Sequence, residues 1–201
     1  MNHHIRKITC IGHSYNYFAA HIPFYFMNQR QITCSIYELD EFVKFFNPPN
    51  NSSKDDEIYL FISHSGDSLQ IRQGLEKLKQ KKINSNYIWG ITTHQNSFLA
   101  KKGHYILPTH AGTETVIGTK SYVSAILVLF FLSRVFLYQE VIPHNIEQEI
   151  RQLIFEMKFY TQDWEYHVKS LTEFLGLDYD FLYFISKGDR KSTRLNSSHY
   201  S

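Results

Sequence analysis

Apolar residues along this chain follow two periods, and the change from one period to the other predicts strands that lead into helices. The segment 58–62 is continuously apolar or aromatic, as a strand that is buried on both faces requires. Beyond Ser68 the apolar positions mostly follow the spacing of a helix face, with charged residues between them: Leu69, Ile71, Leu75 and Leu78. A strand therefore ends and an amphipathic helix begins within 63–68.

The same periods predict further strands and helices on both sides of this unit. Strands are predicted at 6–12, 32–37, 87–92 and 105–107. Helices are predicted at 15–28, 38–46 and 97–102, with a kink or an early break of the first one at Pro23, and 47–53 is predicted to be a surface loop. Strands and helices that alternate in this way predict an α/β fold, with a parallel sheet covered by helices on both faces.

The second half of the chain is predicted to be helical. The run 121–138 is the most apolar one, and a membrane span needs about 20 apolar residues. Because Ser124, Ser133 and Arg134 interrupt this run, we expect a helix buried between the sheet and a partner subunit, and no membrane span. Further helices are predicted from Pro143 and from 162 to Gly176, followed by a strand at 181–185.

Hydroxyl groups gather in the turn where the apolar strand stops and the amphipathic helix begins. This turn reads Ser63, His64, Ser65, Gly66, Asp67 and Ser68. Free backbone N–H groups and the positive end of a helix dipole favour an anion at such a place. Ser65 or Ser68 could instead only cap the helix. A second turn of this kind contains Ser14, and ligands of parallel sheets bind beyond the carboxyl ends of the strands, so the two turns together favour phosphate binding.

Composition narrows the class of protein. The chain has 201 residues, of which 43% are hydrophobic and 20% charged, as is ordinary for a soluble globular protein. Cys10 and Cys34 lie in strand-like runs and are predicted to be reduced core thiols of a cytoplasmic protein. No secretory signal pattern is visible. The histidines lack metal-ligand spacing, so we predict neither a metal nor a cofactor.

The segment 189–201 has no periodicity and resembles the translation of a common sequencing-adapter oligonucleotide, so we exclude it from the fold prediction as an artefact. The formal net charge of the whole chain is +2. Without the three basic residues and one acid of that segment, 18 basic and 18 acidic residues remain. The charge therefore gives no reason to expect a nucleic-acid partner.

Three segments, in this order, resemble the sugar isomerase (SIS) domain: Gly-His-Ser-Tyr at 12–15, the hydroxyl-rich turn at 63–68, and Ala-Gly-Thr-Glu-Thr-Val-Ile-Gly-Thr-Lys at 111–120. The resemblance covers residues 5 to about 138 and is greatest to the isomerase half of glucosamine-6-phosphate synthases and to related sugar-phosphate isomerases and deaminases. It implies a flavodoxin-like, three-layer αβα sandwich around a five-stranded parallel sheet. Residues 181–188 resemble the start of a second SIS domain.

These likenesses predict the organisation of the chain. We expect a first SIS domain at 1–140, a helical linker at 141–178, the start of a truncated second SIS domain at 179–188 and the artefact at 189–201.

The resemblance also assigns residues to a sugar-phosphate site. It implies that the phosphate is held by residues of the two hydroxyl-rich turns: Ser14, Ser63, His64, Ser65, Gly66 and Ser68. It places the sugar near residues of two motifs: Gly12, Glu114, Thr119 and Lys120.

Some of these residues depart from the family pattern or have other interpretations. His64 stands where the family often has Gln, so it could add a donor, or a positive charge at lower pH. Its alternative is a solvated turn residue. Glu114 could be only a helix-start carboxylate, and Lys120 only a surface lysine. Asp67 and Ser68 replace the usual Glu-Thr pair, which keeps an acid and a hydroxyl.

The resemblance implies a homodimer that acts on a sugar phosphate of the fructose 6-phosphate or glucosamine 6-phosphate class, by aldose–ketose isomerisation or deamination. In the family the catalytic groups come mainly from the second domain and tail. We therefore predict no catalytic residue here, and a chain that binds sugar phosphate weakly, if at all, without turnover.

Two other functions stay open. The first is a sugar-phosphate-sensing module of a regulatory protein, although such regulators usually carry a helix-turn-helix before the SIS domain and none is seen here. The second is an isomerase of one SIS domain, against which the long helical stretch after Pro143 argues.

Overall fold

The computed structural model describes residues 5–28, 32–47, 57–114, 118–138 and 144–175. The chain divides into two compact units, 1–143 and 144–201, and each is described by itself. The loop predicted at 47–53 lies almost wholly outside the described residues, as do the strand at 181–185 and the segment 189–201.

The first unit contains a five-stranded, fully parallel sheet. Its strands are β1 (Lys7–Gly12), β2 (Thr33–Glu38), β3 (Glu57–Ile62), β4 (Ile88–Thr92) and β5 (Tyr105–Pro108). They lie in the order β2-β1-β3-β4-β5. This is the flavodoxin-like order, and it confirms the predicted fold class. The chain leaves β1 toward one edge of the sheet and leaves β3 toward the other, so the switch point lies between these two strands.

Helices connect successive strands of this sheet, and one further helix follows its last strand. They are α1 (Tyr15–Ala19), α2 (His21–Asn28), α3 (Leu39–Lys44), α4 (Leu69–Gln80), α5 (Phe98–Lys102) and α6 (Thr119–Tyr138), and the short 3₁₀ helix η1 (Ser85–Tyr87) precedes β4. The predicted helix 15–28 is two helices that meet at Ala20. This break puts Pro23 into the first turn of α2, where a residue without an N–H costs no helical hydrogen bond.

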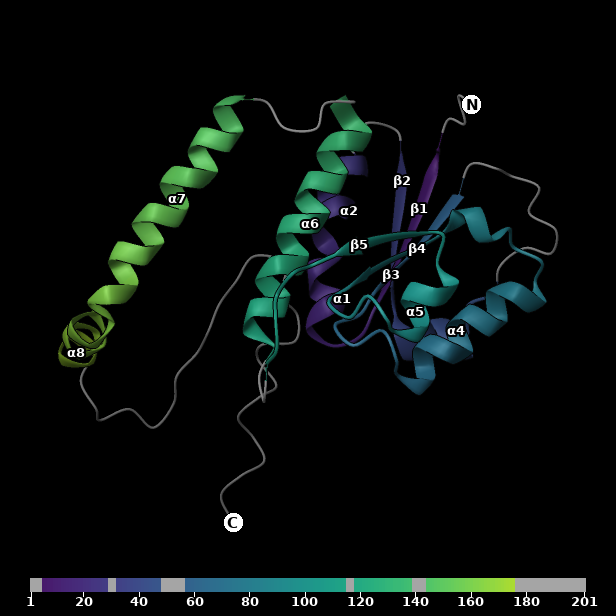
Figure 1. Ribbon diagram of the computed structural model, residues 1–201, viewed down its shortest axis with the longest axis horizontal. Helices are drawn as coiled ribbons and strands as arrows, with labels where there is room; N and C mark the ends of the chain where they lie inside the picture. The colour runs from purple at the N-terminus through teal and green to yellow at the C-terminus, as the bar shows by residue number, and fades with distance from the viewer. Residues whose placement is uncertain (1–4, 29–31, 48–56, 115–117, 139–143, 176–201) are drawn as a thin grey trace, which may run out of the picture. The chain divides into compact units, whose positions relative to one another are not determined.

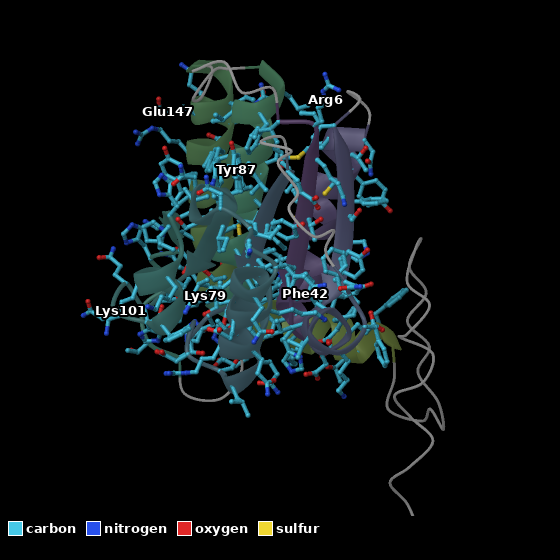
Figure 2. The ribbon with its side chains drawn as sticks, turned by 90° about the vertical axis from the view of Figure 1, so that its right-hand side faces the viewer. Arg6, Phe42, Lys79, Tyr87, Lys101 and Glu147 are labelled. Carbon is cyan, nitrogen blue, oxygen red and sulfur yellow. The ribbon has the colours of Figure 1, made fainter. Side chains whose placement is uncertain are left out.

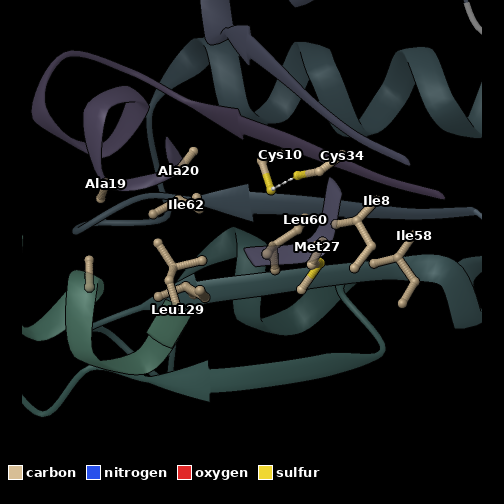
Figure 3. Packing of buried hydrophobic residues seen from close by; sticks show 12 residues of the cluster. Ile8, Cys10, Ala19, Ala20, Met27, Cys34, Ile58, Leu60, Ile62 and Leu129 are labelled. Atoms are coloured by element: carbon tan, nitrogen blue, oxygen red, sulfur yellow. Dashed lines mark hydrogen bonds between the residues drawn. The ribbon is translucent and has the colours of Figure 1, made fainter. Parts of the chain in front are cut away.

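The two faces of the sheet are covered by different helices, with α1, α2 and α6 on one side and α4 and α5 on the other (Figure 1). The first core contains Ile8, Cys10 and Leu60 from the strands and Met27 and Leu129 from the helices (Figure 3). A second core, on the other face of the sheet, contains Ile11, Tyr59, Phe61, Phe42, Ile71 and Leu78. Strand residues thus alternate between two buried faces, which explains the uninterrupted apolar run of β3.

Cys10 and Cys34 are free, buried thiols in the first core, with 3.9 Å between their sulfur atoms (Figure 3). A hydrogen bond with Cys34, together with burial, raises the pKa of Cys10. This agrees with the prediction that both are core thiols.

Glu57, at the start of β3, has a buried carboxylate at the end of the sheet where the strands begin. Arg6, which precedes β1, is labelled in Figure 2 and marks this end. The side chain of Glu57 accepts a hydrogen bond of 2.9 Å from the Thr9 hydroxyl and forms an ion pair of 2.8 Å with Lys7. Because a buried charge is tolerated only when it is paired, these contacts explain an acid at the start of an apolar strand. They lie at the end of the sheet opposite to the two hydroxyl-rich turns.

Helix α6 is long and apolar enough, by length and composition, to cross a membrane over Thr119–Leu137, and it is the one such helix among the described residues. The core helix of a soluble protein satisfies the same criterion. In this fold α6 packs on α2, and one of its faces is fully buried at Ala125, Leu129 and Ser133. Its opposite face exposes Val123, Leu127 and Val135, so the helix is buried on one side only.

The second unit contains α7 (His144–Gln162) and α8 (Trp164–Leu175). The break at Asp163 lies close to the predicted start of the second helix at 162. Tyr160 and His167 stack across this break, with ring centroids 4.0 Å apart. Many apolar side chains of both helices are exposed, among them Phe155, Phe159, Leu171 and Phe174.

Candidate functional site

The two hydroxyl-rich turns follow neighbouring strands. Strands β1 and β3 pair in parallel, and Gly12 at the end of β1 lies opposite Ile62 at the end of β3. Ser14 and the turn 63–68 therefore begin at the same edge of the sheet, at its switch point, where ligands of such sheets bind. The strand order thus brings together the two segments that the sequence had only suggested.

Within the β3–α4 turn, all three serines accept hydrogen bonds from backbone N–H groups. Ser63 Oγ accepts from Gly66 N at 3.0 Å, Ser65 Oγ from Asp67 N at 3.4 Å, and Ser68 Oγ from Ile71 N at 3.3 Å as the N-cap of α4. A hydroxyl that accepts one bond still has its own proton to donate. The capping interpretation is therefore correct for Ser68, and it does not exclude an anion at the same hydroxyl.

Gly66 holds this turn against the start of α5. Its φ of 67° lies in the left-handed region, and a Cβ here would lie 2.4 Å from Ser97 Oγ. The backbone N–H of Leu99 donates to Gly66 O at 2.9 Å, and the Phe98 N–H donates to Asp67 Oδ1 at 2.8 Å. Sequence reasoning gave Gly66 to a ligand and overlooked Ser97, because nothing in a sequence says which loop will touch a given turn.

Ser14 is exposed and has a φ of 54°, which is unusual for a residue with a side chain. It precedes α1 but makes no capping hydrogen bond through its hydroxyl. Gly12 has a packing role, since a Cβ there would lie 2.7 Å from the backbone of Asn16 in α1. The turn after β1 is thus tight, and its strain lies at a serine that no helix cap requires.

The imidazole of His64 is half-buried and bonded to two hydroxyls. Its Nδ1 lies 2.7 Å from Ser121 Oγ, in the first turn of α6, and 3.0 Å from Thr93 Oγ1, just after β4. The ring also meets the ring of His94 edge to face, with centroids 5.3 Å apart. His64 is therefore an anchored side chain, and the alternative of a freely solvated turn residue is wrong for its Nδ1.

Ser121 and Thr93 were missed by sequence reasoning. Ser121 stands at the start of the most apolar run of the chain, where a lone serine carries no signal of its own. The buried hydroxyl of Ser121 links His64 to Glu114 of the third motif.

Glu114 caps the start of α6. Its Oε1 accepts from Lys120 N at 2.5 Å, and its Oε2 accepts from Ser121 N at 3.1 Å and also from the Ser121 hydroxyl. The Ser121 hydroxyl, the two backbone N–H groups and the charge of His64 lower the pKa of Glu114. The alternative of a helix-start carboxylate is therefore correct as far as these contacts go, and a sugar contact stays a prediction.

Lys120 and Thr119 are exposed at the first turn of α6. The ammonium group of Lys120 donates to Thr113 O at 3.1 Å, so it closes the same loop as Glu114. Tyr15 borders this loop: a Cβ at Gly118 would lie 2.6 Å from its ring, and burial followed by the charge of Glu114 raises its pKa.

One cluster with metal-ligand chemistry lies at the ends of β1 and β2, where ligand atoms of His13, Glu38 and Asp40 lie within 4.8 Å of one another. The His13 Nδ1 lies 2.6 Å from Glu38 Oε1, while Glu38 Oε2 accepts from Asp40 N at 2.8 Å and caps α3. Both carboxylate oxygens are engaged, and a helix N-terminus disfavours a cation. We interpret this cluster as a helix cap with an ion pair; sequence reasoning missed it because it depends on strand register.

A family model described as the SIS domain matches residues 3–135. A comparison with curated protein sequences found no match.

Solved structures show the fold of the relatives. The C-terminal domain of glucosamine-fructose-6-phosphate aminotransferase from Francisella tularensis is similar with a TM-score of 0.58 and 21% identity, over 66% of this chain and 36% of that one. A protein from Clostridium difficile 630, named as a proposed phosphosugar isomerase, has a TM-score of 0.62 and 17% identity, over 82% and 46%. A glucosamine-6-phosphate deaminase from Thermotoga maritima has a TM-score of 0.55 and 22% identity, over 64% and 39%. The chain thus spans less than half the length of these three structures.

Proposed function

Because this chain belongs to the SIS domain family, whose model matches residues 3–135, we propose that the edge of its sheet where β1 and β3 end binds the phosphate group of a sugar phosphate. The observation that carries the proposal is the position of the two hydroxyl-rich turns side by side at the switch point, next to the N-terminus of α4. A phosphate needs several donors that converge, and this edge offers hydroxyl protons and the unpaired N–H groups of a first helical turn.

The donors are arranged so that folding does not use up the hydroxyl protons. The hydroxyls of Ser63, Ser65 and Ser68 accept from backbone N–H groups, which leaves each proton for an outside acceptor. The strained backbone of Ser14 supports the same assignment, since strain of this kind gathers at functional sites. In this proposal His64 completes the phosphate site, and Gly66 contributes by holding the turn in shape, because its own N–H and carbonyl are bonded to Ser63 and Leu99.

The sugar end of the ligand lies, in this proposal, toward the loop that Glu114 and Lys120 close. Direct contacts from Gly12, Glu114, Thr119 and Lys120 remain predictions, because Gly12 has a packing role and Glu114 and Lys120 are bonded to their own loop. The names of the related structures support a phosphorylated hexose or amino sugar, and fructose 6-phosphate is the probe we would use.

The reaction of the whole protein is proposed to be aldose–ketose isomerisation or deamination of an amino-sugar phosphate. Either reaction needs a base that moves a proton between C1 and C2 of the open sugar. We assign the described residues to binding and name no such base among them. Conversion of fructose 6-phosphate by the purified chain would overturn this part of the proposal.

We also propose that the chain forms a homodimer. Apolar side chains are exposed on α1 and α2 at Phe18, Phe24 and Tyr25, and on α6 at Val123 and Leu127. Such faces are usually covered in an assembly. Sedimentation equilibrium tests this: a monomer at micromolar concentration would contradict it.

The binding experiment is isothermal titration of the full chain with fructose 6-phosphate, inorganic phosphate and fructose. The first two should bind and fructose should not. Replacing Ser65 with Ala should weaken fructose 6-phosphate binding by about tenfold, the value of a hydrogen bond to a charged group. The matched control is Ser85→Ala in η1, an exposed serine that precedes β4 at the opposite end of the sheet. Equal binding by both variants would overturn the assignment.

A further inference from the structure

His64 is linked to the carboxylate of Glu114 by two successive hydrogen bonds, with no direct contact between the two side chains. Its Nδ1 lies 2.7 Å from Ser121 Oγ, and the same hydroxyl donates to Glu114 Oε2. Ser121 is only 2% exposed, so water does not compete for its hydroxyl. His64 follows the end of β3, Glu114 lies in the loop after β5, and Ser121 lies in the first turn of α6.

The ionisation of Glu114 determines where the protons lie in this series of hydrogen bonds. Glu114 is ionised near neutral pH, because hydrogen bonds from Ser121 and Lys120 lower its pKa, and an ionised carboxylate only accepts. The single proton of the Ser121 hydroxyl is therefore directed to Glu114. Ser121 Oγ is left as an acceptor, and the group 2.7 Å away that can donate to it is the Nδ1–H of His64.

The second contact of the ring agrees with this arrangement. Thr93 Oγ1 lies 3.0 Å from the same Nδ1 and 2.7 Å from Thr109 Oγ1. Either hydroxyl of this pair can donate, and when Thr93 gives its proton to Thr109, the Thr93 oxygen is a second acceptor for Nδ1–H. No described residue bonds to Nε2 of His64, so Nε2 is the nitrogen that a ligand can use.

We propose that Ser121 and Glu114 are positioning residues that fix His64 as the Nδ1–H tautomer and let Nε2 take up a proton that is donated to the phosphate of the bound sugar phosphate. The proposal rests on the proposed function of this site. It makes the protonated ring of His64 a phosphate ligand, and such a charge-assisted hydrogen bond is about twice as strong as a neutral one.

The charges around the His64 ring determine whether binding of the phosphate strengthens or weakens as the pH falls. Glu114, reached through Ser121, favours the imidazolium, while the ring of His94, 5.3 Å away, opposes it whenever that ring is charged. The ammonium of Lys120 is held at Thr113 O, and Tyr15, whose pKa is raised, stays neutral. Among the residues that the structure describes, Glu114 is therefore the negative group that is linked to the ring, through the hydroxyl of Ser121. Apart from the ionisation of the phosphate itself, binding should therefore tighten as the pH falls.

The first measurement is ¹⁵N NMR of the histidine side chains in the full chain, with the His64 signals assigned by their loss in His64→Gln. Without ligand and at alkaline pH, where the imidazole is neutral, the wild type should show the Nδ1–H tautomer. Ser121→Ala should weaken this preference, since Nδ1–H then keeps Thr93 alone as its acceptor. Glu114→Gln should weaken it further, because the Ser121 proton is then free to turn to His64. Backbone spectra of the same samples show whether each variant is folded. An Nε2–H tautomer in the wild type would overturn the proposal.

The second measurement is fructose 6-phosphate affinity from pH 8 to 6, expressed as the ratio of wild type to His64→Gln. This ratio cancels the ionisation of the phosphate itself. We expect it to rise by about fivefold as the pH falls, and to rise less when both proteins carry Ser121→Ala, because the link from the ring to the Glu114 charge is then lost. A flat ratio in the wild type would overturn the proposal. If neither protein binds fructose 6-phosphate, the proposed function fails, while the free-protein tautomer still decides for or against the positioning role.

Discussion

Gly66 and Ser97 approach each other so closely that a single added methyl group has no room: a Cβ at position 66 would lie 2.4 Å from Ser97 Oγ and 3.0 Å from Thr92 Oγ1. Ser97 is itself fixed, because it is buried and caps α5 by accepting from Ala100 N at 3.2 Å. The hydroxyl-rich turn after β3 is therefore held in place by the loop after β4, and Gly66 is the residue that permits the contact.

Replacing Gly66 with Ala should destabilise the protein more than backbone strain alone predicts. The left-handed φ of 67° costs a residue with a side chain about 1–2 kcal/mol, and overpacking against Ser97 adds about 1–3 kcal/mol. Urea unfolding gives the free energy of unfolding.

The matched control for this substitution is Gly112→Ala. Gly112 has a similar φ of 74°, and a Cβ there would meet nothing within 4 Å. The difference between the two variants isolates the close contact. If both lose the same stability, the contact with Ser97 contributes nothing.

Helix α6 offers a direct test of whether its apolar sequence serves a protein core. Leu129 is fully buried against the sheet, while Val135 of the same helix is 42% exposed and lies outside the residues assigned to the proposed dimer face. Leu129→Ala should cost about 2–5 kcal/mol, as cavities in cores do, and Val135→Ala less than about 1 kcal/mol. Urea unfolding of both variants measures this. Similar losses at both positions would contradict the assignment of one buried face.

How far the sequence predicted this fold can be seen from β3 and α1. The continuous apolar run of β3 identified a strand buried on both faces, because helices cover both sides of the sheet. The break at Ala20 was placed three residues too late, at Pro23, because a proline ends a helix before itself and is tolerated in the first turn of the next one. The sequence therefore predicted the strand β3 correctly and the existence of a helix break correctly, but it misplaced the exact residue of the break.

The candidate site was predicted only in its parts. Serines at strand ends can be read from a sequence, and so can Gly66. The contacts His64–Ser121 and His13–Glu38 depend on strand order and register, which no local pattern contains. Ser121 in particular was invisible, since a buried hydroxyl at the start of an apolar helix is interpreted as a helix former until its partner is known.

Ser14→Gly should separate stability from binding. A glycine adopts the φ of 54° without strain, and the Ser14 hydroxyl caps no helix, so stability should stay unchanged or rise by up to about 1 kcal/mol. Fructose 6-phosphate binding should nevertheless weaken, because one donor is lost. Thermal unfolding and calorimetric titration measure the two effects.

Ser14→Ala serves as the companion variant, because it removes the same hydroxyl and keeps the backbone strain. It should bind as weakly as Ser14→Gly and be less stable. Undiminished binding by both variants would show that Ser14 does not contact the ligand.

The ionisation of Glu114 should make stability depend on pH in a predictable direction. Its pKa is lowered in the folded protein, first by the Ser121 hydroxyl and then by backbone N–H groups, so folding favours the ionised form. The contribution is therefore fully present above the ordinary pKa of a glutamic acid, about 4.3, and is lost as the pH falls through the lower folded value. Glu114→Gln cannot ionise, so its deficit in stability relative to the wild type should be largest near pH 7 and shrink below about pH 4. Urea unfolding between pH 7 and pH 3 measures this difference.

The control is Glu76→Gln. Glu76 is an exposed carboxylate of α4 whose cationic neighbour, Lys79, is 3.9 Å away, so this variant should differ in stability from the wild type by almost nothing at any pH. A deficit for Glu114→Gln that does not change with pH would mean that the shape of the carboxylate matters and its charge does not, and the same result would remove the reason for directing the Ser121 proton away from His64.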